Sequence, residues 1–210
     1  MTSRETRAIC EMAPIVPVLV IDDAAHARPL AEALVAGGLP ALEVTLRTPA
    51  ALEAIRIMAQ VPGGVVGAGT LVTPEDVRAA KAAGARFGVS PGATDSLLAA
   101  CEAEGLPLLP GAATASEAMR LLERGYDMLK FFPAEASGGA PALKAIGAPL
   151  PQIGFCPTGG VSPQNAESYL SLPNVVCAGG SWVAPKNMVA AGDWAGIEAL
   201  ARAAAALRRE

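Results

Sequence analysis

The sequence is poor in histidine, aromatic residues and charge. Its 210 residues contain one histidine, 4% aromatic residues and 17% charged residues, with a formal net charge of −4. With one histidine and no acidic groups at ligand spacing, we expect no metal site, catalytic or otherwise. The negative charge and the lack of a Lys/Arg cluster argue against a nucleic-acid partner. His26 falls in a predicted helix, and we expect it to face solvent.

Long apolar runs and targeting segments are also missing. No run approaches the roughly 18 residues that a membrane span needs. The N-terminus has no basic region followed by an apolar stretch, the pattern typical of a signal peptide. The cysteines lack metal-type spacing, so we expect packed, reduced thiols at Cys10, Cys101, Cys156 and Cys177. These features predict a cytoplasmic protein with no membrane partner.

The chain does carry a repeating pattern of a short β-rich run, a turn and an Ala/Leu-rich helical segment. Strands are predicted at 17–21, 41–46, 65–70, 85–90, 106–111, 128–133, 152–157 and 175–179. Helices are predicted at 24–37, 49–60, 74–83, 94–104, 115–124, 139–146, 163–171 and 193–208. Eight such units predict one domain, residues 1–210, folded as a (β/α)8 TIM barrel. An open doubly wound sheet is the alternative, but the turn at 21–24 lacks its Gly-rich phosphate loop.

The ends of these helices carry recognisable signals. Residues 2–12 predict a short helix over the bottom of the barrel, with Thr2 and Glu5 at capping-box spacing and Ile9 and Met12 facing inward. Hydroxyl caps are predicted at Thr48-Pro49, Thr73-Pro74, Ser162-Pro163 and Thr114, and a carboxylate cap at Asp193. Left-handed glycine caps are predicted at Gly37-Gly38, Gly84, Gly105 and Gly125.

Polar side chains on strand 41–46 indicate a functional interior. Period two places Glu43, Thr45 and Arg47 on one face and three aliphatic residues on the other. Because the aliphatic face must meet the helices, the polar face lines the barrel. A carboxylate, a hydroxyl and a guanidinium there need partners or a ligand. The alternative is a buried Glu43–Arg47 pair with a purely structural role.

A lysine in strand 128–133 is the centre of the functional prediction. The same alternation turns Lys130 and Phe132 inward, so that Lys130 shares one space with Glu43 and Arg47. Desolvation favours the uncharged form of an amine, and an uncharged amine can attack a carbonyl. The alternative is a strand-end lysine whose ammonium group reaches water.

Glycine-rich segments follow the seventh and eighth predicted strands. Gly159-Gly160 comes after the seventh strand, and Gly179-Gly180-Ser181 after the eighth. In barrels of this kind, such loops present backbone N–H groups to a phosphate. Thr70 supplies a further hydroxyl at the rim.

Taken together, these motifs resemble the 2-dehydro-3-deoxy-6-phosphogluconate (KDPG) and 4-hydroxy-2-oxoglutarate (KHG) aldolase family. The resemblance covers nearly the whole chain and is carried by residues 42–47, 66–70, 90–92, 130–135, 155–161 and 179–182. It implies a class I aldehyde-lyase on a (β/α)8 barrel, without metal or cofactor and usually a homotrimer. The implied reaction splits KDPG into pyruvate and glyceraldehyde 3-phosphate, with KHG, giving pyruvate and glyoxylate, as a further substrate.

The resemblance also implies roles for single residues. Lys130 would form the Schiff base, and Glu43 would carry protons. The implied binding residues are Arg47 and Thr70 for the carboxylate and carbonyl region of pyruvate, Pro91 and Phe132 for the pocket wall, and Gly159, Gly160, Gly180 and Ser181 for the phosphate. This chain has Asp22-Asp23 where several members carry a basic residue after the first strand.

The residues leave other functions open. The 2-dehydro-3-deoxy-6-phosphogalactonate aldolase of the same family acts on an epimer that differs at one hydroxyl. A phosphate-binding barrel isomerase or decarboxylase could use Lys130 as an acid or an electrostatic clamp. A sugar-phosphate-binding protein without activity is disfavoured, because recognition alone does not need a desolvated lysine.

Overall fold

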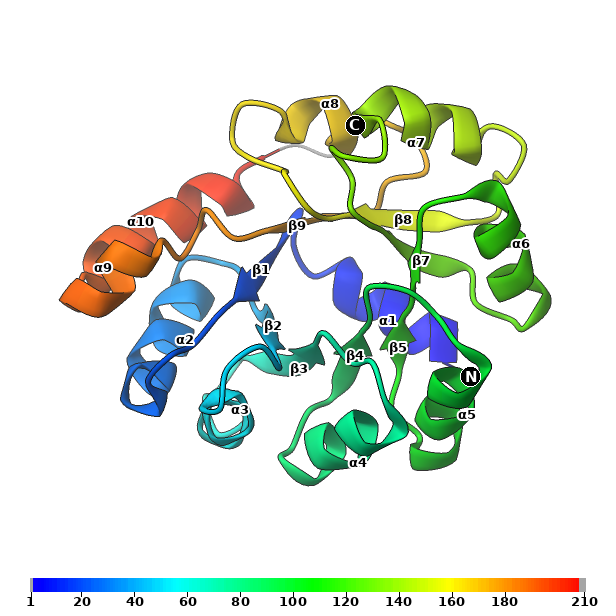
Figure 1. Ribbon diagram of the computed structural model, residues 1–210. Coiled ribbons are helices and arrows are strands. Elements are labelled where there is room, and N and C mark those ends of the chain that lie inside the picture. Colours follow the sequence, from blue (N-terminus) through cyan, green and yellow to red (C-terminus); the bar gives the residue numbers. More distant parts are fainter. Residues whose placement is uncertain (1, 208–210) are drawn as a thin grey trace.

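The computed structural model describes residues 2–207, in which parallel strands form a central ring with helices outside it (Figure 1). The strands are β1 Ile15–Leu19, β2 Ala41–Thr45, β3 Val65–Gly69, β4 Phe87–Val89, β5 Leu108–Leu109, β6 Gly111–Ala112, β7 Met128–Phe131, β8 Gly154–Pro157 and β9 Ala178–Gly180. The helices are α1 Thr2–Cys10, the 3-10 helix η1 Ala24–His26, α2 Ala27–Ala36, α3 Ala51–Met58, α4 Pro74–Ala82, α5 Asp95–Glu104, α6 Ala115–Glu123, α7 Gly139–Gly147, α8 Ala166–Leu170, α9 Lys186–Ala191 and α10 Trp194–Ala205.

Parallel pairing runs around the ring. The order β5-β4-β3-β2-β1-β9 forms one run and β6-β7-β8 another. β5 and β6 are the halves of the predicted strand 106–111, and they are separated by Pro110, which has no N–H to donate. The carbonyl of Pro110 still accepts a bond from the Lys130 N–H at 2.9 Å. The two runs of strands also meet between β8 and β9, where isolated parallel bridges pair Phe155 with Val175 and Thr158 with Gly179 and so close the ring. The predicted (β/α)8 barrel is confirmed.

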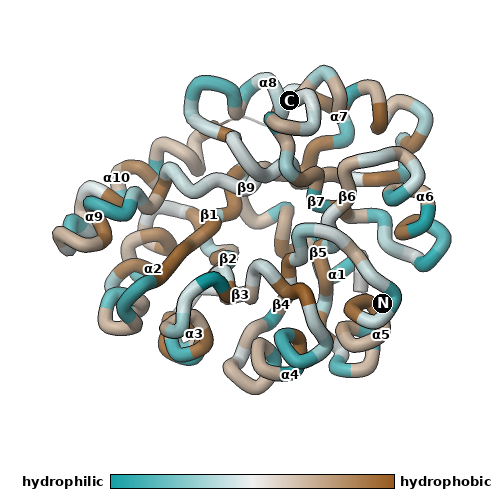
Figure 2. Tube along the Cα trace, viewed as in Figure 1, coloured by the Kyte–Doolittle hydropathy of each residue, from teal (hydrophilic) through white to brown (hydrophobic). Residues whose placement is uncertain are grey.

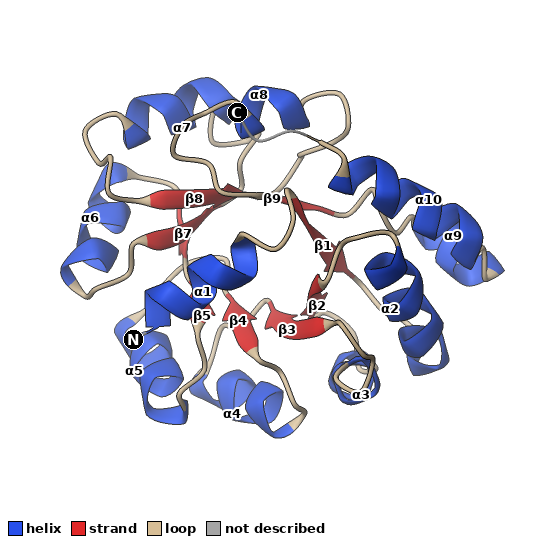
Figure 3. Ribbon diagram, turned by 180° about the vertical axis from the view of Figure 1, so that it is seen from behind, coloured by secondary structure: helices blue, strands red, loops and turns tan. Residues whose placement is uncertain are grey.

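Helix α1 lies across one end of the ring (Figure 3). Its hydroxyl side chains donate hydrogen bonds to backbone carbonyls just before or at the start of strands at that end of the ring. Ser3 Oγ donates to Gly125 O at 3.0 Å, and Thr6 Oγ1 donates to Leu108 O at 3.2 Å. The prediction that this helix covers the bottom of the barrel is therefore confirmed.

The inner face of α1 differs in part from the prediction. Ile9 packs, half-buried, against the apolar cluster inside the ring as predicted, whereas Met12 lies beyond the helix end and is 45% exposed. Hydroxyl residues of the helix also face inward, because unpaired carbonyls at the barrel bottom require donors. The capping role predicted for Thr2 falls on a side chain outside the described part of the chain.

Helix caps were predicted correctly where the partner is local. Thr73 and Thr114 each form a capping box, and Asp193 accepts a bond from the Gly196 N–H at 2.9 Å. Positive φ angles are found at the predicted left-handed glycines Gly38, Gly84, Gly105 and Gly125, whereas Gly37 is right-handed.

Two predicted caps were wrong, at Thr48 and Ser162. Helix α3 begins at Ala51, because Thr48 Oγ1 instead donates to Ile21 O at 2.5 Å and ties two strand ends together. Helix α8 begins at Ala166, after an irregular turn that starts at Ser162.

The last part of the chain and His26 also depart from the prediction. Helix α9, which follows the eighth strand of the barrel, lies outside the predicted helix ranges, because its six-residue sequence gives little periodicity. The predicted helix 193–208 is α10, and residue 208 lies outside the described range. His26 is half-buried rather than fully solvent-facing, because its ring lies 5.8 Å from that of Trp194 at a tilt of 56°.

Apolar residues fill both the space between strands and helices and the lower barrel. Figure 2 shows hydrophobic colour along β1 and β4 and hydrophilic colour on outer helices such as α6. Inside the ring, near α1, a separate cluster contains Cys10, Val16, Ala41, Val65, Phe87, Val89, Leu109, Met128, Cys156 and Cys177.

The predicted packed, reduced cysteines are confirmed, since all four thiols are free and buried. Burial raises the pKa of the Cys101 thiol to about 12. Within residues 2–207, no helix has the length and apolar character of a membrane span.

Candidate active site

A cavity of about 300 Å³ opens at the carboxyl ends of the strands. This is the end of such barrels that carries reactive groups. All the predicted site residues except Gly180 line it, namely Glu43, Arg47, Thr70, Pro91, Lys130, Phe132, Gly159, Gly160 and Ser181.

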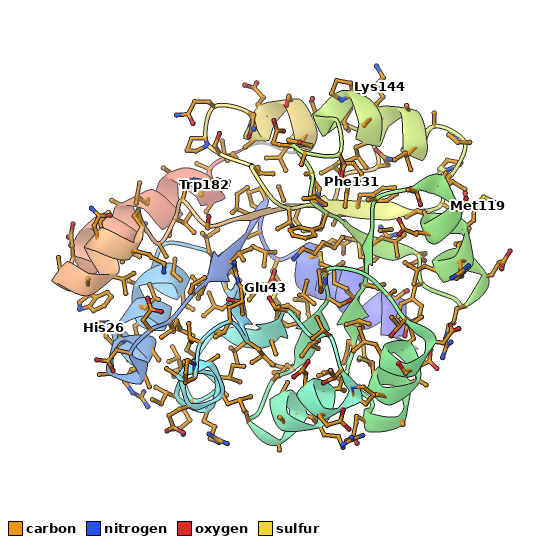
Figure 4. All side chains as sticks on the ribbon, in the orientation of Figure 1. His26, Glu43, Met119, Phe131, Lys144 and Trp182 are labelled. Carbon is orange, nitrogen blue, oxygen red and sulfur yellow. The ribbon has the colours of Figure 1, made fainter. Side chains whose placement is uncertain are left out.

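A buried ion pair forms the floor of this cavity. Lys130 on β7 and Glu43 on β2 approach to 3.4 Å between Nζ and Oε1. The Lys130 side chain is 7% exposed and that of Glu43 is 3% exposed. Figure 4 shows Glu43 in the interior of the ring. Because little water reaches either group, each depends on the other for charge compensation. This places a nucleophilic amine next to a carboxylate that can exchange protons with it.

Small residues on neighbouring strands make room for this chemistry. A Cβ at Gly69 on β3 would lie 2.3 Å from Glu43 Oε1, so any side chain there would displace the carboxylate. A Cβ at Gly179 would lie 2.3 Å from Thr158 Oγ1 in the same way. Thr45, inward-facing as predicted, donates its hydroxyl to Leu19 O at 2.9 Å and links β2 to β1. The close backbone of Gly69 and Gly179 and the bond to Leu19 O thus restrict where the side chains of Glu43, Thr158 and Thr45 can lie.

An aromatic wall covers the amine. The Phe132 ring centroid lies 5.0 Å from Lys130 Nζ, within the range of a cation–π contact. The wall continues through Gly159, where a Cβ would lie 3.3 Å from the Phe132 ring. Arg47 lies on the cavity wall and is exposed, so the guanidinium is available to an anionic ligand. Thr70 takes the left-handed conformation with φ 62°, the only non-glycine residue to do so among residues 2–207.

The glycine-rich loops form one side of the cavity. Gly159 and Gly160 have φ of 99° and 83°, and Ser181 lies beside them. Gly180 is the exception to the predicted set. A Cβ there would lie 2.0 Å from the Trp182 ring, so this glycine makes space for Trp182 to pack.

Besides the inward-facing Thr45, four residues line the cavity that had been given no role in substrate binding or catalysis: Val18, Thr158, Val161 and Gly179. Thr158 is the most polar of them and is 6% exposed. Its hydroxyl lies 3.8 Å from Cys156 Sγ. A hydrogen bond from the Cys177 thiol lowers the pKa of the Cys156 thiol, against the opposing effect of burial. Period two counted from the inward Cys156 would have identified Thr158.

The two aspartates after β1 lie outside the cavity. Asp22 Oδ2 is 3.4 Å from Lys186 Nζ, and both side chains are exposed. Asp23 accepts a bond from the Ala25 N–H at 2.9 Å and caps η1. Lys186 of α9 therefore supplies a basic group beside the acidic segment Asp22-Asp23 that follows β1.

Comparisons with known proteins agree with this geometry. The family model described as KDPG and KHG aldolase matches residues 6–200. A 2-dehydro-3-deoxy-phosphogluconate aldolase of Pseudoalteromonas atlantica is 57% identical over 92% of this chain and 90% of its own length. The 2-keto-3-deoxy-6-phosphogluconate aldolase of Zymomonas mobilis, solved with 3-phosphoglycerate, superposes with a TM-score of 0.95 at 51% identity, over 99% of this chain and 98% of that one. The KDPG aldolase of Legionella pneumophila, with pyruvate captured as a covalent carbinolamine, gives a TM-score of 0.92 at 48% identity, over 95% and 98% of the two chains.

Proposed function

This chain belongs to the KDPG and KHG aldolase family, and from that premise we propose that it cleaves KDPG into pyruvate and glyceraldehyde 3-phosphate by a class I mechanism. The observation that carries the proposal is the buried pair of Lys130 and Glu43 at 3.4 Å on the floor of the cavity. The carbinolamine captured in the Legionella pneumophila protein supports amine chemistry in this family.

The first half of the reaction forms the Schiff base. Glu43, 3.4 Å away, first takes one proton from the Lys130 ammonium, and the neutral amine attacks the C2 ketone of the substrate. A second amine proton moves to the ketone oxygen to give a carbinolamine. The Glu43 carboxylic acid then returns its proton to the departing hydroxyl, so that water leaves and the iminium forms. Arg47 and Thr70 at the mouth hold the substrate carboxylate and carbonyl region. Pro91 forms a further part of the pocket wall.

The second half breaks the carbon–carbon bond. Glu43 takes the proton of the C4 hydroxyl, the C3–C4 electron pair moves into the iminium, and glyceraldehyde 3-phosphate leaves. Glu43 then returns that proton to C3 of the remaining enamine, and water hydrolyses the resulting iminium to release pyruvate and restore Lys130. Binding of the phosphate by Gly159, Gly160 and Ser181 orients the reacting bond, and such remote binding contributes to the rate.

Borohydride trapping with pyruvate tests the amine. We expect the wild-type protein to gain the mass of one reduced pyruvate adduct, and the Lys130→Met variant to gain none. Lys144→Met is a matched control, because Lys144 lies on α7 outside the cavity and points away from the barrel (Figure 4). An adduct that persists in Lys130→Met, or that disappears in Lys144→Met, would refute the assignment.

Glu43 has a separate test. Glu43→Gln keeps the shape of the side chain but cannot take a proton, so kcat for KDPG cleavage should fall by about 10²-fold to 10⁴-fold. Unchanged circular dichroism would show that the barrel is intact. Full activity of this variant would remove Glu43 from the proton path.

Substrate preference and assembly complete the proposal. We propose that KDPG is preferred over its galactonate epimer and over KHG, which a comparison of kcat/KM for the three substrates would decide. The family also supports a homotrimer in the cytoplasm. Light scattering should then give three times the mass of one chain, and a monomer mass would contradict the trimer.

A further inference from the structure

The Gly159-Gly160 turn is held from the side opposite the cavity. The Glu135 N–H donates to the Gly159 carbonyl at 3.0 Å, and Asn165 Nδ2 donates to the Gly160 carbonyl at 3.1 Å. Glu135 and Asn165 line a separate outer groove and not the active-site cavity. The two carbonyls therefore point out of the cavity.

This anchoring fixes where the next N–H groups point. The peptide bonds after Gly159 and Gly160 are trans, since the only cis bond in the described range precedes Pro133. In a trans peptide, the C=O of one residue and the N–H of the next point in opposite directions. The N–H groups of Gly160 and Val161 are thus turned toward the cavity that both residues line. Neither has an acceptor within residues 2–207, so they form an open pair of donors for an anion.

Packing behind the turn supports the same geometry. A Cβ at Gly160 would lie 2.5 Å from Glu135 Cγ, so the Glu135 side chain fills the space behind this glycine. The hydroxyl of the buried Tyr169 donates to the Glu135 carboxylate and holds it there. Two consecutive glycines are otherwise free to move, and ordering them costs conformational entropy.

Asn165 forms its hydrogen bond to Gly160 instead of the helix-capping bond that an asparagine at this position usually forms. It occupies the N-cap of α8, where asparagine normally accepts a bond from an N–H of its own helix. Its side chain makes no such bond. Instead, Oδ1 accepts from the Ser162 N–H at 2.8 Å while Nδ2 reaches Gly160 O. By contrast, the N-cap residues Thr73, Thr94, Thr114 and Asp193 all cap their own helices. A broken local rule of this kind is expected where function requires it.

We propose that Asn165 is a positioning residue that selects for the phosphate of the substrate. Its amide holds the Gly160 carbonyl outward and so keeps the Val161 N–H directed at the phosphate, beside the Gly160 N–H that the bond from Glu135 to the Gly159 carbonyl orients. The proposal rests on the proposed function, in which this loop binds phosphate. It adds a specificity determinant that lies outside the cavity and touches no substrate atom.

The test compares two aldehydes that differ by one phosphate. In aldol addition with pyruvate, Asn165→Ala should raise KM for glyceraldehyde 3-phosphate about 3-fold to 10-fold, the effect of losing one hydrogen bond. KM for pyruvate and kcat/KM for unphosphorylated D-glyceraldehyde should stay at the wild-type values. Inorganic phosphate should lose inhibitory potency by the same factor as glyceraldehyde 3-phosphate loses affinity.

Two further variants make the test specific. Asn165→Asp keeps the acceptor for the Ser162 N–H but has no N–H to donate, so it should behave at least as badly as Asn165→Ala. Gln164→Ala truncates an exposed neighbouring amide and should match the wild type. The proposal is overturned if Asn165→Asp matches the wild type, if Gln164→Ala shifts KM equally, or if both aldehydes are affected alike. Borohydride trapping of pyruvate reports on the aldolase function independently, so its failure is distinguishable from failure of the Asn165 role.

Discussion

Removing one partner of the buried pair should have unequal effects on stability. Lys130→Met leaves the Glu43 carboxylate without a partner at a site where its side chain is 3% exposed. Breaking a buried pair in this way costs roughly 3–5 kcal/mol. The cavity of about 300 Å³ above the pair can supply water to the carboxylate. We therefore expect the lower end of that range, about 3 kcal/mol of lost unfolding free energy.

The reverse change should cost less. In Glu43→Gln the amide oxygen can still accept a hydrogen bond from Lys130 Nζ, and the Phe132 ring remains 5.0 Å from this group, so the ammonium keeps part of its compensation. We expect a loss of about 1 kcal/mol, close to that of one hydrogen bond. In the double variant, no charge remains in the pair. Its stability should return to within about 1 kcal/mol of the wild type, because uncharged replacements of buried pairs are often neutral.

Urea unfolding followed by the fluorescence of Trp182 and Trp194 measures these differences. The midpoints give differences in free energy as long as the slope with denaturant is unchanged. The reasoning is refuted if Lys130→Met unfolds within about 0.5 kcal/mol of the wild type, the size of an ordinary surface change. It is equally refuted if the double variant is no more stable than Lys130→Met, since the cost would then not come from an unpaired charge.

Two other predictions concern a glycine and a helix cap. Gly69→Ala would place a methyl group 2.3 Å from Glu43 Oε1, so kcat should fall by at least about 10-fold through displacement of the carboxylate. Gly92→Ala, with no atom within 4 Å of its new Cβ, should leave kcat unchanged, and equal effects of the two would contradict the geometric explanation. A hydrogen bond from the Ala113 N–H lowers the pKa of Glu117 below its usual 4.5, so Glu117 stabilises the fold above that pH and loses this contribution as pH falls through the lowered pKa. Glu117→Gln should therefore be less stable than the wild type at pH 7, with a difference in unfolding free energy that narrows as pH falls below 4.5, and a difference that stays constant in urea titrations over this range would contradict the cause.

Alternation along strands made much of the site predictable. Glu43 and Lys130 lie far apart in the sequence, yet each belongs to a strand whose aliphatic face must meet the helices. Closure of the barrel then brings their polar faces into one space, as the 3.4 Å contact shows. The argument needs only period two and the parallel ring, and both follow from local pattern.

Features that depend on distant partners were not predictable in this way. Thr48 precedes a proline as a helix cap would, but its hydroxyl serves Ile21 on another strand end. The bond from Asn165 to Gly160 likewise depends on how an irregular turn folds back on itself. In both cases the residue type suggested a local hydrogen bond, and tertiary structure supplied a different one.

The division of the barrel interior explains why the reactive amine lies where it does. On β7, Met128 belongs to the apolar cluster above α1, and Lys130, two residues further, meets Glu43 at the cavity floor. On β8 the same step leads from Cys156 to Thr158. An amine at the position of Met128 would lie in the apolar cluster away from the cavity, and one at the half-buried position of Phe132 would be more exposed to water than Lys130 is. The last inward position before the cavity is thus the one place on β7 where a lysine is both desolvated by the layer beneath it and accessible to a ketone from above.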